Sequence, residues 1–246
     1  MDLTVMSAFL GRDKKQVPAV VACAKEVGAE VLCLQEVMDF ELPHLQENYR
    51  FTRFVPMTRF VDGSTMGLVT CTNLAVSEVR EQYYMGDATE LTLFDESTPD
   101  QVNNTKRRPL LTCTLLKSGR WYAVGNTHFL YSKEGKFGEQ HHLSLRSLAE
   151  ILRPYKKLIL CGAMVMLRDG SLYNEFVQTS GLQDWVPRTI ECTLDRKLHK
   201  LSALMNSGAM PLVVVDYIFG VGCSPVVTVC QFEGVCDHTP LLTMVQ

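Results

Sequence analysis

Short apolar segments that are typical of β-strands recur along almost the whole chain of 246 residues. They are separated by polar or glycine-containing turns, such as the one at Ser118 and Gly119. So many consecutive strands with short connections predict antiparallel hairpins within mixed sheets. We expect strands at residues 3–10, 30–34, 49–55, 66–72, 74–84, 90–94, 109–117, 120–127, 157–161, 211–219, 225–232 and 241–245.

Three segments have the pattern of helices. The first covers residues 14–27, with Asp13 as its N-cap and Gly28 at its end. The others cover residues 137–152 and 172–179, whereas polar residues 95–106 predict an exposed loop. The β-α-β order at the start favours a layered α/β arrangement. Since no linker or repeat interrupts the pattern, we predict one domain over residues 1–246.

Composition limits the functional classes. The hydrophobic fraction of 46% suffices for a large core, and a net charge of −3 excludes nucleic-acid binding by a general basic excess. Nine cysteines without a CxxC pair indicate core thiols in a reducing, intracellular compartment. The N-terminal apolar segment lacks the basic start of a secretory signal. We also expect no membrane span, because no apolar run approaches about 20 residues.

Polar residues follow four of the apolar runs and form the candidate site. Glu36 ends the Leu-Gln-Glu segment at 34–36, and His128 ends the Asn-Thr-His segment at 126–128. Asp216 lies inside an apolar strand, where a carboxylate costs several kcal/mol unless it is paired or coordinated. Asp237 and His238 open the Asp-His-Thr-Pro-Leu segment at 237–241. Taken singly, each has an ordinary structural explanation, since a Glu or His after a strand is usually a turn residue.

Together, these segments resemble the endonuclease/exonuclease/phosphatase superfamily. Its signatures Leu-Gln-Glu, Thr-His, Asp-x-Ile-Phe and Ser-Asp-His-x-Pro-Leu occur in the right order, with Cys236 in place of the last serine. They extend from residue 34 to residue 241, and the last two are the most specific. Residues 34–37, 45–49 and 167–169 are similar to tyrosyl-DNA phosphodiesterase 2-like members, although the deadenylase branch shares the first of these segments equally well.

The resemblance implies a four-layer α/β/β/α sandwich of two mixed β-sheets, the DNase I-like fold, with the active site where strand ends of both sheets converge. Glu36 would be the main ligand of Mg²⁺ or Mn²⁺, and Asp237 would lie near the same metal. His238, oriented by Asp216, and His128 would contact the scissile phosphate. Water would attack a phosphodiester or phosphomonoester in line.

Three positions depart from the family pattern. Phe9 stands where the first strand normally ends in an asparagine, and Ala163 and Val165 replace the Asp and Asn of a Gly-Asp-x-Asn motif. Loss of a transition-state donor costs about 10²–10³ in rate, and loss of a general base about 10²–10⁴. Apolar side chains here would also weaken metal binding.

We therefore expect a pseudoenzyme that binds a nucleic acid, a phosphorylated ligand or a protein partner in a larger assembly. The alternative is an active Mg²⁺-dependent phosphodiesterase or nuclease with a rebuilt site, and an unrelated α/β domain with chance matches is the third reading. The run Lys106-Arg107-Arg108 is the only compact basic cluster. Such a run is usually a solvated loop end, but Arg107 and Arg108 are candidates for contact with phosphate.

Overall fold

Two six-stranded sheets form the centre of the protein. The computed structural model describes residues 2–12, 16–132 and 135–246, so the expected N-cap Asp13 lies outside the described residues. In the first sheet the order is β11 (Pro225–Gln231), β12 (Leu241–Val245), β1 (Leu3–Phe9), β2 (Val31–Met38), β4 (Thr65–Thr72) and β3 (Phe51–Arg59). In the second it is β5 (Ala75–Met85), β6 (Arg108–Lys117), β7 (Arg120–His128), β8 (Leu158–Ala163), β10 (Asp216–Val221) and β9 (Gln183–Asp184).

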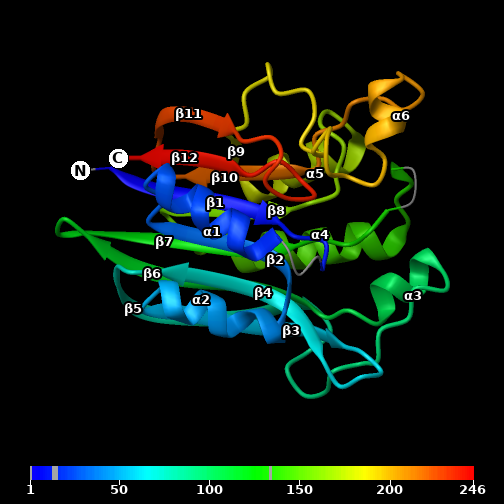
Figure 1. Cartoon of the computed structure of the whole chain (residues 1–246), viewed down its shortest axis with the longest axis horizontal. Helices are drawn as coiled ribbons and strands as arrows, with labels where there is room; N and C mark the ends of the chain where they lie inside the picture. The colour runs from blue at the N-terminus through cyan, green and yellow to red at the C-terminus, as the bar shows by residue number, and fades with distance from the viewer. Residues whose placement is uncertain (1, 13–15, 133–134) are drawn as a thin grey trace.

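Both sheets are mixed, as expected. β1 is parallel to β2 and β7 is parallel to β8, whereas the other neighbouring strands are antiparallel. The first and last strands pair, so the two ends of the chain lie side by side (Figure 1). The helices are α1 (Gln16–Glu26), α2 (Leu42–Asn48), α3 (Pro99–Asn104), α4 (Glu139–Leu152), α5 (Ser171–Ser180) and α6 (Ser202–Asn206), with a 3₁₀ turn, η1, at Asp39–Glu41.

Helices cover the outer faces of both sheets, which confirms the predicted α/β sandwich. The apolar side of α1 packs on β1 and β2 through residues that include Val17 and Val20. The helix ends before Gly28, whose φ of +67° suits a left-handed C-terminal turn. On the other side, α4 and α5 contribute Leu148 and Phe176 to the largest core cluster.

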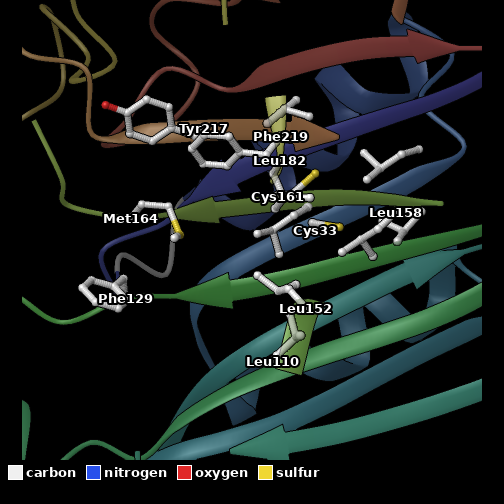
Figure 2. Close-up of a cluster of buried hydrophobic side chains, with 14 of the residues drawn as sticks. Cys33, Leu110, Phe129, Leu152, Leu158, Cys161, Met164, Leu182, Tyr217 and Phe219 are labelled. Carbon is white, nitrogen blue, oxygen red and sulfur yellow. The ribbon is translucent and has the colours of Figure 1, made fainter. Parts of the chain in front are cut away.

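That cluster continues between the two sheets. Cys33 of β2 and Cys161 of β8 approach each other there (Figure 2), and their thiols are hydrogen-bonded. All eight cysteines whose side chains the structure describes are free. The reducing compartment remains a prediction. No helix of the described ranges has the length and apolar character needed to cross a membrane.

Several predicted segments were wrong in detail. The expected loop at 95–106 contains helix α3, which starts because the Thr98 hydroxyl accepts a hydrogen bond from Gln101 N and Pro99 occupies the first turn. Residues 90–94 are not a strand, since Leu93 makes only an isolated bridge to Arg59. The apolar run at 211–215 is irregular, and its strand begins only at Asp216.

Candidate functional site

The candidate site lies at one edge of the sandwich because of the strand directions. The parallel pairs β1/β2 and β7/β8 occupy the middle of the sheets, so their carboxyl ends meet at this edge. β10 and β12 run the opposite way beside them, which brings the start of β10 and the loop before β12 to the same place. Phe9 and His128, from different sheets, are in edge contact with ring centroids 5.4 Å apart.

Glu36 is placed in the site by a bulge. The pairing of β2 with β4 shifts register between Leu34 and Val37, and Glu36 has a φ of +56°. A positive φ is uncommon for a residue with a side chain and occurs mostly where the surrounding structure fixes it. The bulge leaves the carboxylate buried at the strand end, where it needs a positive partner.

That partner is Lys106. Its Nζ lies 2.5 Å from Oε1 of Glu36, and the two side chains are only 5% and 7% exposed. Lys106 lies between α3 and β6, in the basic run that the sequence analysis assigned to a solvated loop end. The ammonium also lies over the ring of Phe94, 4.9 Å from its centroid. Lys106 is therefore held from two sides by a carboxylate and an aromatic face.

The two members of this pair respond differently to burial. Burial alone raises the pKa of Glu36, but the charges of Lys106, His128 and Arg12 and the hydrogen bond from Lys106 outweigh it and lower the pKa from 4.5 to about 2. The pKa of Lys106 is also lowered, because burial outweighs the attraction of Glu36 and Arg108 adds repulsion. The geometry supports an ionised pair, since a short ammonium–carboxylate contact is the arrangement that compensates two buried charges.

Arg12 adds a second positive charge at the rim. Its Nε lies 3.8 Å from Oε2 of Glu36, and its Nη1 lies 3.4 Å from a carboxylate oxygen of Glu96. The guanidinium also lies over Phe94, 5.2 Å from the ring centroid. The ring of Phe94 thus contacts both of the cations that lie beside Glu36, Lys106 and Arg12.

His128, Ala163 and Asp216 form a row across the second sheet. Ala163 is the register partner of His128 on one side and of Asp216 on the other. Nδ1 of His128 has no hydrogen-bond partner and lies 3.7 Å from Oε1 of Glu36. Burial, with Arg108 and Lys106 nearby, holds the pKa of His128 well below its usual value despite Glu36. This histidine is therefore neutral near pH 7.

His238 is oriented by Asp216, as the resemblance implied. Its Nδ1 lies 2.8 Å from Oδ2 of Asp216, which gives that buried carboxylate its partner. Burial alone lowers the pKa of His238, but Asp216 and then Asp237 outweigh it, and the pKa is raised. The hydroxyl of Thr193 accepts hydrogen bonds from the backbone N–H groups of Val215 and Asp216, which fixes the start of β10.

Asp237 lies on the histidine side of the site. Its backbone N–H donates to Oε1 of Gln16, and its Oδ2 lies 3.7 Å from Nε2 of His238. Oδ2 also lies 3.8 Å from Nε2 of His199, a residue that the sequence analysis did not single out. The two predicted metal ligands thus differ in their surroundings, because Glu36 contacts Lys106 and Arg12 as well as His128, whereas Asp237 contacts the imidazoles of His199 and His238.

The three departures from the family pattern lie among these groups. The Phe9 ring is 4.2 Å from that of His238, centroid to centroid, and also contacts His128, so it fills the space between the two histidines. Ala163 is completely buried. Val165 has a φ of +53°, an outlier for a β-branched residue but a common conformation for asparagine.

The arginines next to Lys106 donate hydrogen bonds to neighbouring parts of the protein. Arg107 donates to the carbonyl oxygens of Pro56 and Asp87. Arg108 is fully buried and donates to the carbonyl oxygen of His128 and to Oδ1 of Asn103. These bonds support the backbone around the site, and contact of either arginine with phosphate stays a prediction.

The residues present do not fit the magnesium site that the resemblance implies. Mg²⁺ is held by one or two carboxylates with several waters. The charge of Glu36 is already balanced by the ammonium of Lys106, and Phe9 and Val165 offer no oxygen ligand. No step of a reaction is therefore assigned to Mg²⁺ in this chain.

No protein-family model and no curated protein matches the sequence. Solved structures do match over the whole chain. An endonuclease/exonuclease/phosphatase family protein from Leptotrichia buccalis is 15% identical, with a TM-score of 0.67 and coverage of 99% of both chains.

Two further structures have more specific descriptions. A humanized D. rerio TDP2 with 14 mutations is 14% identical, with a TM-score of 0.65, and covers 100% of this chain and 99% of its own. A mannosyl-6-phosphatase from Bacteroides thetaiotaomicron is 13% identical, with a TM-score of 0.66 and coverage of 99% of both chains. At such identities the likeness shows the fold alone.

The sheet topology and these matches show the fold: the chain is folded like the endonuclease/exonuclease/phosphatase structures, in the DNase I-like arrangement. In this chain, Lys106 is paired with Glu36 and a phenylalanine lies between the two histidines.

Proposed function

We propose that this protein is a catalytically impaired member of the endonuclease/exonuclease/phosphatase fold class that acts by binding rather than by hydrolysis. The observation that carries the proposal is the buried ion pair of Lys106 with Glu36. The ammonium of Lys106 supplies the positive charge at this position in place of a hydrated metal ion. It cannot, however, lower the pKa of a bound water or clamp two oxygens of an in-line displacement.

The surrounding substitutions support the same proposal. Ala163 and Val165 cannot position an attacking water or donate to a phosphoryl oxygen, and Phe9 fills space between the two histidines. Each lost function costs at least about 10² in rate. The effects of residues that act as a unit are not additive, so the combined loss is not the product of the single losses.

For the ligand, the local charge favours a phosphate-bearing molecule. Arg12 is 38% exposed at the rim beside Glu36, and the pKa of His238 is raised. A nucleic acid or a smaller phosphorylated compound presents the anionic oxygens that these groups bind. Binding of a protein partner in a larger assembly is the second binding function that we propose.

Two measurements test the proposal. Hydrolysis of bis-p-nitrophenyl phosphate, single-stranded DNA and a 5′-tyrosyl oligonucleotide is followed with Mg²⁺ and with Mn²⁺, and we expect turnover far below about 1 s⁻¹. Binding of a labelled 5′-phosphorylated oligonucleotide is measured in EDTA, with Arg12→Ala as the test variant and Arg146→Ala, an exposed arginine of α4, as the control. Turnover near 1 s⁻¹ would contradict the proposal that the site is catalytically impaired. Unchanged oligonucleotide binding by Arg12→Ala would contradict the proposal that Arg12 at the rim binds the phosphate.

One observation favours the alternative of an active phosphodiesterase with a rebuilt site. The 2.8 Å hydrogen bond of His238 with Asp216 is intact, and the pKa values of His128 and His238 are shifted in opposite directions. Such a separation is typical of acid and base pairs. This alternative requires measurable hydrolysis that is lost in His238→Ala.

A further inference from the structure

Two histidine side chains converge on the carboxylate of Asp237. His199 and His238 point their Nε2 atoms at Oδ2 of Asp237 from distances of 3.8 and 3.7 Å. One ligand atom from each of the three residues lies within 4.8 Å of the others. The two histidines are buried, whereas the Asp237 side chain is 23% exposed. The cluster is therefore formed inside the protein and open on one side.

The distances do not fit direct hydrogen bonds. An N–H···O bond has its heavy atoms 2.7–3.2 Å apart, so contacts of 3.7 and 3.8 Å leave Asp237 without a hydrogen bond to either ring. Two ligands at about 2.0–2.1 Å from a tetrahedral cation are about 3.4 Å apart. The three atoms thus surround a point at which a cation would be near bonding distance of each.

The supporting contacts of His238 are those of a metal ligand. Nδ1 of His238 is hydrogen-bonded to Asp216, which leaves Nε2 facing the cluster, and a carboxylate behind a ligating histidine fixes its orientation. Asp237 is anchored by the bond from its backbone N–H to Gln16. In the part of the chain that the structure describes, the ion pairs of Asp237 involve histidines only.

We propose that His199, Asp237 and His238 bind one borderline divalent cation, with Zn²⁺ preferred, and leave a fourth position open to solvent. Imidazole ligands select Zn²⁺, Co²⁺ and Ni²⁺ over Mg²⁺, and affinity follows the order Mn²⁺ < Co²⁺ < Zn²⁺. The site differs from the expected magnesium site, because it includes His199 and excludes Glu36, which Lys106 holds.

Binding has one structural consequence that can be measured. Nδ1 of His199 accepts a hydrogen bond from the backbone N–H of Leu201 at 3.1 Å, so in the free protein the neutral ring carries its proton on Nε2. A cation at Nε2 moves that proton to Nδ1 and ends the bond from Leu201. Metal binding must overcome this loss, and the Leu201 amide becomes less protected from hydrogen exchange.

The experiment uses the full chain, stripped with EDTA and dialysed, in calorimetric titrations with Zn²⁺, Co²⁺ and Mg²⁺. We expect one Zn²⁺ per chain, weaker Co²⁺ binding with the visible absorption of a tetrahedral site, and no comparable Mg²⁺ binding. His199→Ala lowers Zn²⁺ affinity by about tenfold or more, since even supporting residues contribute that much. His44→Ala, on α2, is the matched control and leaves the affinity unchanged.

Two further variants keep the result interpretable. Asp237→Asn preserves shape but removes the charge, so it weakens Zn²⁺ binding even if His199→Ala fails to fold. We expect Glu36→Gln to leave the Zn²⁺ affinity unchanged. This result distinguishes the site at His199, Asp237 and His238 from cation binding at Glu36. The cysteines are common to all variants, so any thiol binding cancels in the comparison. Equal Zn²⁺ affinity in the wild type, His199→Ala and Asp237→Asn overturns the proposal, as does the absence of Zn²⁺ binding to the folded wild type.

Discussion

The ammonium of Lys106 and the carboxylate of Glu36 lie 2.5 Å apart although 70 positions separate them in the sequence. Removing one partner of a buried pair leaves an uncompensated charge and costs about 3–5 kcal/mol. It also opens the position that a divalent cation needs. The side chain of Lys106 thus affects both the stability of the fold and the binding of a divalent cation at Glu36.

We expect Mg²⁺ to stabilise the Lys106→Ala variant but not the wild type. We expect a loss of about 3–5 kcal/mol in the free energy of unfolding without metal. Mg²⁺ should restore part of it, about 2.7 kcal/mol at a hundredfold excess over its Kd. Chemical denaturation with and without Mg²⁺ measures both effects. Lys25→Ala, which removes an exposed lysine that contacts Asn48, is the control. Equal stabilisation of the wild type by Mg²⁺ would show that the ammonium does not exclude the cation.

Acid should weaken the fold through Glu36. Its pKa is about 2 in the folded protein and 4.5 ordinarily, so the unfolded chain binds the proton first. The resulting stability, on the order of 3 kcal/mol, is present above pH 4.5 and is lost as the pH falls towards 2. Lys106 keeps its proton across this acid range. The difference between the wild type and Glu36→Gln in denaturation series from pH 6 to pH 2 isolates this contribution, and parallel curves would refute it.

Val165→Asn should stabilise the protein. The φ of +53° at Val165 is costly for a β-branched side chain, and asparagine adopts it readily. We expect a gain of about 1 kcal/mol, seen as a higher denaturation midpoint at an unchanged m-value. Val165→Thr keeps the branched Cβ and should give no gain. If both substitutions act alike, the conformation at this position is not strained.

Restoring the family residues should not restore hydrolysis while Lys106 remains. The triple variant Phe9→Asn, Ala163→Asp, Val165→Asn regains the missing polar groups, but Glu36 is still paired with the ammonium. We expect Mg²⁺-dependent hydrolysis of bis-p-nitrophenyl phosphate only after Lys106→Ala is added, with thermal melts confirming that each variant folds. Full activity of the triple variant would show that Mg²⁺ displaces the ammonium of Lys106 from Glu36.

Much of the fold could be predicted because local patterns agree with the tertiary structure. The apolar runs at β1, β4, β6 and β7 are buried strands close to their expected bounds. The failures occurred where a local signal was ambiguous. The polar stretch 95–106 predicts a loop, although Pro99 within it also suits the first turn of a helix. Residues 211–215 are apolar enough for a strand, yet they lie outside the named strands of the sheet.

The sequence by itself determined the order of the motifs, and the family resemblance that they carry implied that Glu36, His128, Asp216 and His238 gather at one edge. Motif order is local information that does not depend on the packing of the chain. Only the tertiary structure decided which side chains complete the site. Lys106 and His199 come from irregular segments whose paths depend on long-range packing, and neither carries a motif. Lys106 balances the charge of Glu36, because a buried carboxylate takes the partner that the fold places within reach, and His199 is brought to face Asp237 in the same way.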